Sequence, residues 1–197
     1  IYLAPGATHG PHQVAREWSE KYRGRFDEGW EALREETFRR QKELGWIPED
    51  AELTPIDPTM QRWAEVPEAQ REFQCRLMEV YAGFLEHTDH HVGRLIDAID
   101  QLGVLDDPLI YYIIGDNGAS AEGTPNGTFN ELMSLNGASA LETTEMMVSH
   151  LDEFGTPAAY NHYAVGWAHA MDTPYQWTKQ VASHWGGTRN GTIVHWP

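Results

Sequence analysis

The feature that most constrains the fold is the stretch at residues 109–120, LIYYIIGDNGAS. It opens with six apolar or aromatic residues, rich in the β-branched and aromatic types that favour strands, and these end at Gly115. The pattern predicts a buried strand over residues 109–114. Asp116 and Asn117 follow directly, between two glycines that allow a tight turn and a close backbone approach.

An acid and an amide at the end of a buried strand are candidate metal ligands. In α/β enzymes, ligands gather at the carboxyl ends of parallel strands. The Asp116 carboxylate and the Asn117 carbonyl are hard oxygen donors, which favour Ca²⁺, with Mg²⁺ as the second choice, over Zn²⁺. The same residues also suit an Asp-Asn-Gly turn that only reverses the chain. The residues alone leave both interpretations open.

A long amphipathic helix is predicted over residues 67–103. Apolar residues recur there at spacings of three and four, and Gly103 is a suitable C-terminal cap. A helix followed closely by a strand is typical of α/β folds. We expect this helix to cover one face of a sheet through four of its apolar residues, Leu77, Phe84, Leu95 and Ile99.

The other segments carry weaker signals. Residues 1–5 resemble the end of a strand, which we expect to run parallel to residues 109–114 in one sheet. Residues 24–44 suit one or two surface helices, whereas four prolines make residues 46–68 irregular. A helix is predicted over residues 143–154, and a strand over residues 192–196.

Two positions are candidates for binding an anion. His9 lies in the loop at residues 6–13, which follows a strand-like run, and a histidine in such a loop can donate a hydrogen bond to an anionic oxygen. Lys179 is a cation in a part of the chain poor in bases. A polar surface loop and a solvated lysine explain the same residues equally simply.

The overall charge limits the classes of partner. With 14 basic and 30 acidic residues the formal net charge is −16, which argues against a nucleic-acid surface. An anionic substrate therefore needs a locally positive pocket. No apolar run approaches the roughly 18 residues of a membrane span, so the sequence predicts a soluble chain without a membrane partner.

The order of motifs resembles the sulfatase family, and bacterial arylsulfatases in particular. The resemblance is carried by APGATHGPHQ after a strand, a helix ending in VGRLIDAIDQLG, GDNG after the next strand, and TPYQWTKQVASHWGGTR before a last strand. It implies the α/β fold of the alkaline-phosphatase superfamily, a mostly parallel sheet flanked by helices. We expect residues 1–197 to be the central part of a single catalytic domain, so that the fold is incomplete here.

The resemblance also implies roles for single residues. Asp116 and Asn117 match the second pair of calcium ligands in the family. His9 resembles the histidine that hydrogen-bonds the sulfate ester, and Lys179 the lysine that contacts a sulfate oxygen. His12 is the second candidate in the first loop, and His184 is close enough in sequence to share the role of Lys179.

The sequence departs from the family at the nucleophile. Sulfatases use a Cys or Ser in a C/S-x-P-x-R motif, oxidised to formylglycine, and no such motif occurs in this chain. Cys75 is followed by Arg-Leu-Met and suits a packing role. We expect the nucleophile and the first pair of metal carboxylates upstream of Ile1, and therefore no turnover by this chain alone.

The function implied is hydrolysis of a small-molecule sulfate ester to an alcohol or phenol plus sulfate. One alternative is a phosphodiesterase or phosphonate hydrolase of the same superfamily. Another is a non-catalytic domain stabilised by calcium. The natural substrate, the oligomeric state and the compartment, cytoplasmic or periplasmic in a bacterium, stay open at this stage.

Overall fold

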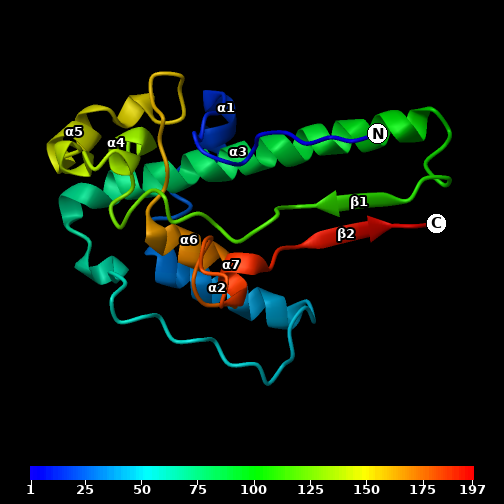
Figure 1. Ribbon diagram of the computed structural model, residues 1–197, viewed down its shortest axis with the longest axis horizontal. Helices are drawn as coiled ribbons and strands as arrows, with labels where there is room; N and C mark the ends of the chain where they lie inside the picture. Colours follow the sequence, from blue (N-terminus) through cyan, green and yellow to red (C-terminus); the bar gives the residue numbers. More distant parts are fainter.

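The computed structural model describes all of residues 1–197 as an assembly of helices with one two-stranded sheet (Figure 1). The α-helices are α1 (Arg16–Ser19), α2 (Gly29–Glu43), α3 (Glu68–Gln101), α4 (Glu131–Leu135), α5 (Thr144–Ser149), α6 (Val165–Met171) and α7 (Trp185–Thr188). Single 3₁₀ turns are η1 (Glu20–Tyr22), η2 (Trp63–Glu65), η3 (Ser139–Leu141) and η4 (Leu151–Glu153). The strands are β1 (Ile110–Ile113) and β2 (Thr192–His195).

Helix α3 is the long helix that the sequence predicts, and it runs the length of the molecule (Figure 1). Its first half is surrounded by protein, because every residue from Phe73 to Val80 is buried. Its second half is largely exposed. Gly103 adopts φ +71° directly after the helix, and its N–H donates to the Asp100 carbonyl at 2.7 Å, which confirms the predicted cap. None of the helices is both long and apolar enough to cross a membrane.

The hydrophobic core lies between helices and not against a sheet. Trp167 of α6 is fully buried, and its Nε1–H donates to the Gln74 carbonyl of α3 at 3.1 Å. Its ring meets that of Trp30 from α2 edge to face at 5.5 Å. Leu77 belongs to this core. The prediction that Leu77 packs on a sheet is therefore wrong, because α3 packs against α1, η1 and α5, with Trp167 of α6 bonded to its buried half.

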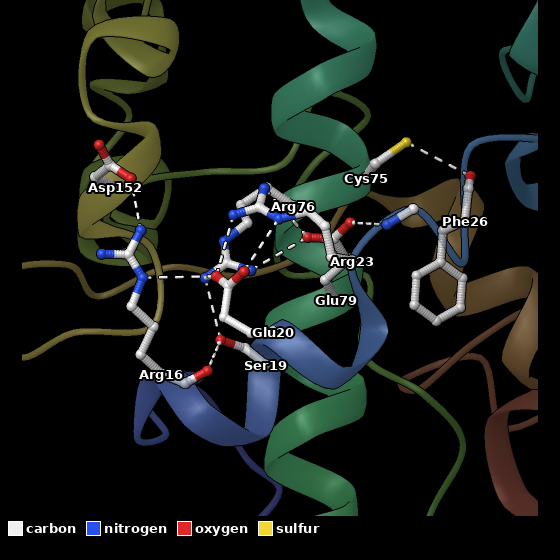
Figure 2. A network of polar contacts seen from close by, with 10 residues as sticks. Arg16, Ser19, Glu20, Arg23, Phe26, Cys75, Arg76, Glu79 and Asp152 are labelled. Atoms are coloured by element: carbon white, nitrogen blue, oxygen red, sulfur yellow. Dashed lines mark hydrogen bonds and ion pairs between the residues drawn. The ribbon is translucent and has the colours of Figure 1, made fainter.

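A second part of the interior is polar. Figure 2 shows the network between α1, η1 and α3, in which the Arg76 guanidinium contacts Glu79 at 3.2 Å and Ser19 at 3.1 Å. Arg76 also pairs with Glu20 at 3.2 Å. The second oxygen of Glu79 accepts the Gly24 N–H at 2.8 Å. Each buried charge in this network thus has a partner.

The sheet differs from the prediction. Strands β1 and β2 form where the sequence places them, but they pair antiparallel, with Ile110 opposite His195, and no parallel sheet is present in residues 1–197. The predicted burial of the first strand is also wrong, since Tyr111 and Ile113 are about 60% exposed (60% and 62%). Ile110 and Tyr112, on the other face of β1, are half-buried, whereas all four residues of β2 are exposed.

Residues 1–5 form no strand, so the predicted parallel pairing with β1 is wrong. Tyr2 is 93% exposed there, so this segment has no neighbouring strand within the chain to pair with.

The pair of strands β1 and β2 contacts α3, where the Tyr112 hydroxyl donates a hydrogen bond to Asp89 at 3.2 Å. The exposed half of α3 runs beside strands β1 and β2 (Figure 1).

Three further segments can be compared with the predictions from sequence. Helix α2 lies within the predicted residues 24–44, and residues 46–68 contain only the single turn η2 before α3 begins. The helix expected at residues 143–154 is shorter, because α5 ends at Ser149 and η4 follows after His150. Thr143 caps α5 by accepting the Met146 N–H on its side chain at 3.3 Å.

Candidate active site

The turn after β1 packs directly against the Gly-Gly turn near the C-terminal end. Gly118 N–H donates to the Gly187 carbonyl at 3.2 Å, and a Cβ added at Gly118 would lie 1.5 Å from the Gly186 carbonyl oxygen. Only glycine fits at this contact. The Asn190 side chain also donates to the Asn117 carbonyl at 2.8 Å. The two most specific motifs of the sequence are therefore one structural unit.

Asp116 and Asn117 form an oxygen-rich corner on this unit. Asp116 is exposed, and Asn117 Nδ2–H donates to Asp116 Oδ1 at 2.8 Å. This orientation leaves the Asn117 Oδ1 and the second Asp116 oxygen as acceptors. The donors fit a hard divalent cation such as Ca²⁺, which takes six to eight oxygen ligands in proteins. Two residues supply only part of such a set.

The Lys179 backbone is hydrogen-bonded to the loop that follows Asp116 and Asn117, and the Lys179 side chain contacts His9. Its N–H donates to the Ala119 carbonyl at 2.9 Å, three residues after Asp116. Its Nζ lies 3.3 Å from Nε2 of His9, although the two residues are 170 positions apart in sequence. His9 is exposed, and its backbone N–H donates to the Gly6 carbonyl at 3.0 Å, which forms a turn in this loop. A histidine and a lysine thus meet beside the predicted metal ligands.

Glu122 is the counter-charge of Lys179. Lys179 Nζ contacts both Glu122 oxygens, at 3.1 and 3.3 Å, and Ser120 Oγ–H donates to Glu122 at 2.7 Å. Burial raises the pKa of the Glu122 carboxyl, but the bonds from Ser120 and Lys179 outweigh it and leave the pKa below its usual value. The carboxylate is therefore ionised and fixes the position of the lysine.

A shallow open hollow of about 100 Å³ lies over this pair. Its walls are Ala121, Glu122, Lys179 and Gln180. A small anion that enters it meets the Lys179 ammonium, a local positive charge on a chain whose formal net charge is −16. The Glu122 carboxylate pairs with that ammonium, so residues 1–197 alone do not provide the locally positive pocket that an anionic substrate requires.

No hydrogen bond joins the side chain of either second-choice histidine to Lys179, Asp116 or Asn117. His12 is 1% exposed, its ring stacks on Tyr163 at 5.0 Å, and burial holds its pKa well below the usual value. It is a neutral core residue. His184 precedes α7 and contacts Ser183 at 2.9 Å. Cys75 is buried, and burial raises the pKa of its thiol to about 12, which leaves no thiolate for nucleophilic attack.

The Asp172 side chain stabilises the turn that follows β1. Its Oδ1 accepts the Ala119 N–H at 2.8 Å, and its Oδ2 is buried without a partner. Burial raises the pKa of this carboxyl to about 8. Asp172 is accordingly protonated at neutral pH and holds the backbone between Asp116 and the Lys179 contact.

Comparison with known proteins identifies the family of this chain. The family model described as Sulfatase matches residues 1–197, the whole chain. The chain belongs to the sulfatase family. It is 33% identical over 197 residues to an uncharacterized sulfatase of Schizosaccharomyces pombe, and 26% identical over 196 residues to an arylsulfatase of Klebsiella aerogenes. These matches cover 100% of this chain but 34% and 40% of the two relatives.

Membership of the sulfatase family implies the alkaline-phosphatase-like α/β fold for the complete domain. Within residues 1–197 that fold is represented by helices and one antiparallel pair of strands. The chain spans between about a third and two fifths of the relatives it matches, so a sulfatase domain of their length has further segments available to extend the sheet.

Sequence reasoning missed three residues that lie close together beside Lys179: Glu122, Glu131 and His162. Glu122 lies only six residues after Asp116, in the same loop, and its acid next to a predicted strand end was a usable signal. Glu131 and His162 gave none. They are single residues among 30 acids and 10 histidines, and only the folded chain brings them together.

Proposed function

We propose that this chain is the part of a sulfatase that supplies one half of the active site for hydrolysis of a sulfate ester to an alcohol or phenol plus sulfate. The observation that carries the proposal is the approach of Lys179 to His9, 3.3 Å apart, on a lysine whose backbone is bonded to Ala119 beside Asp116. A resemblance to an arylsulfatase of Klebsiella aerogenes supports an aryl ester as substrate.

In this proposal His9 and Lys179 bind the sulfate group. A sulfate monoester carries one negative charge, and charge builds on the ester oxygen as its bond to sulfur breaks. The Lys179 ammonium offers hydrogen bonds and a positive charge to a sulfate oxygen. The ring of His9 accepts from this ammonium at Nε2, so in this proposal it donates to the ester oxygen only after the lysine turns to the sulfate and Nε2 gains a proton.

Glu122 is the residue that fixes the lysine. Because it contacts Lys179 through both oxygens and is itself held by Ser120, the ammonium has a defined position at the hollow. Asp172 holds the intervening turn through Ala119. These two acids are positioning residues in this proposal, since Glu122 acts through Lys179 and Asp172 acts through the backbone of the turn.

Asp116 and Asn117 are the proposed ligands of Ca²⁺. When bound, the ion neutralises charge on the sulfate oxygens. The formylglycine nucleophile of the family has no counterpart motif in this sequence, so residues outside this chain complete the proposed site. Accordingly, residues 1–197 alone should show no aryl sulfate hydrolysis above a buffer blank.

The test is Asp116→Ala in the full-length protein, with calcium affinity measured by calorimetry and aryl sulfate hydrolysis by steady-state kinetics. We expect loss of both, because Asp116 contributes a full charge to the ion, and a smaller loss in Asn117→Ala, which removes a neutral oxygen. Asp106→Ala, an exposed acid ahead of β1, is the matched control and should resemble the parent.

Two results would oppose the proposal. A folded Asp116→Ala protein that binds calcium and hydrolyses aryl sulfate like the parent would mean that the turn only reverses the chain. A parent protein that hydrolyses an aryl phosphate diester or phosphonate faster than an aryl sulfate would assign the site to phosphoryl chemistry instead.

A further inference from the structure

Three side chains beside the lysine converge on one point. Glu122, Glu131 and His162 each offer one ligand atom, and these atoms lie within 4.8 Å of one another. The backbone fixes this arrangement, because Thr128 and His162 exchange two hydrogen bonds, at 3.0 and 3.1 Å, and Glu131 N–H donates to the Tyr160 carbonyl at 3.0 Å. The convergence therefore does not depend on flexible side chains alone.

Glu131 is the member whose environment is unsatisfied. It is only 6% exposed, and its Oε2 is buried with no hydrogen-bond partner. The chain closes over this oxygen at Gly10, where an added Cβ would lie 2.6 Å from it. An ionised carboxylate buried without a partner is costly, so this side chain calls for a proton or a cation.

The charges of the cluster do not balance. Lys179 pairs with Glu122 at 3.1 Å, and His9 lies beyond the lysine, 3.3 Å from its Nζ. One ammonium thus faces two carboxylates. The Glu131 carboxylate is left without a cation of its own, which favours an additional positive ion at this point.

His162 is in the form that binds a metal. It is 1% exposed, and its Nδ1 lies 2.9 Å from the Tyr163 carbonyl. This contact places the ring proton on Nδ1 and leaves the Nε2 lone pair free, the arrangement in which metal-binding histidines are commonly held. Burial lowers the pKa of the ring to about 4, so the ring is neutral at pH 7.

We propose that Glu122, Glu131 and His162 form a binding site for Zn²⁺, distinct from the oxygen-only calcium corner at Asp116 and Asn117. Two carboxylates and one imidazole are a donor set for a transition metal, and three protein ligands leave a coordination position for water. A cation bound here shares Glu122 with Lys179 and so weakens the ion pair that restrains the lysine.

The experiment uses the full-length protein, stripped with a chelator, returned to saturating Ca²⁺ and titrated with Zn²⁺ by calorimetry. We expect one Zn²⁺ equivalent in the parent and at least 100-fold weaker binding in Glu131→Gln, a variant of nearly the same shape. Glu145→Gln, an exposed acid on α5, is the control and should bind like the parent. Circular dichroism and thermal melting confirm that each variant is folded.

Two further variants separate this site from others. Asp116→Ala should keep the Zn²⁺ equivalent, and its loss there would assign the ion to the calcium corner and overturn the proposal. His87→Ala tests the exposed His87 and His91 pair on α3, whose Nε2 atoms lie 3.0 Å apart. Zinc binding lost in His87→Ala and kept in Glu131→Gln would also overturn it.

The readout is independent of hydrolysis, so its result and that of the proposed function are separable. A parent protein that binds no Zn²⁺ beside saturating Ca²⁺ would contradict the zinc site and leave the sulfatase proposal untouched. In that outcome Glu131 is neutralised by a proton, because burial and the charge of Glu122 raise its pKa.

Discussion

The polar network at α3 and the cluster around Lys179 are built from the same kinds of residue but differ in how completely they are paired. In the α3 network, Arg76 and Glu79 are 4% and 3% exposed in their side chains, and every charged group has a partner (Figure 2). In the Lys179 cluster, Glu131 Oε2 is buried without one. Asp172 Oδ2 is unpaired as well, on the side chain that accepts the Ala119 N–H.

The difference separates a structural role from a binding role. A network that satisfies itself within the chain joins elements, here α1 and η1 to α3, and gains nothing from an added ligand. A cluster with unpaired acids beside a solvent-exposed hollow is stabilised when a proton, a cation or a substrate binds to those acids. The comparison predicts that the same substitution has different consequences in the two places.

The largest expected effect is in the paired network. Arg76→Leu should lower the free energy of unfolding by about 3–5 kcal/mol, because it leaves the Glu79 charge buried without its main partner. The double variant Arg76→Leu with Glu79→Leu should be less destabilised than the single one. The measurement is denaturant unfolding, with Arg39→Leu on the exposed face of α2 as control, where no resolvable change is expected. A stable single variant would show that the network is not structural.

The next effect is a pH dependence that originates at Asp172. Its folded-state pKa of about 8 lies above the ordinary value, so the folded chain keeps a proton that the unfolded chain releases. This contribution to stability is complete below about pH 4 and is lost as pH rises through about 8. We expect the parent to lose roughly 1–3 kcal/mol relative to Asp172→Asn across that window, measured by unfolding at several pH values. Parallel curves for the two proteins would contradict this.

The smallest effect is a difference of sign between two Glu→Gln variants. Without metal at pH 8, Glu131→Gln should leave stability unchanged or raise it by about 1 kcal/mol, because it replaces a buried carboxyl whose Oε2 has no partner. Glu79→Gln should lower it by about 1–3 kcal/mol, because Arg76 then loses a charged partner. Thermal melts in a chelator give both values. Equal destabilisation in the two variants would remove the distinction between the clusters.

Much of the local structure could be predicted from the sequence. The spacing of apolar residues predicts α3, Gly103 predicts its end, and the β-branched run predicts β1, because these signals come from neighbours along the chain. The burial of β1 could not be predicted correctly. A strand that is apolar on both faces implies layers on both sides, but the face that carries Tyr111 and Ile113 has no such layer within residues 1–197.

The candidate site was predictable in part for the same reason. Asp116, Asn117, His9 and Lys179 stand in recognisable motifs. The contact between His9 and Lys179 joins residues 170 positions apart, and no local pattern encodes it. The partners of the lysine, and the orphaned oxygen of Glu131, are consequences of tertiary packing.

The central claim is that His9 and Lys179 act together on a sulfate ester. The most direct test is a double-mutant cycle in the full-length protein, with His9→Asn, Lys179→Met and both, measured as kcat/KM for an aryl sulfate. We predict a loss of about 100-fold or more for Lys179→Met, and a double variant whose loss is smaller than the product of the two single losses. Folded single variants with the kcat/KM of the parent would contradict the account.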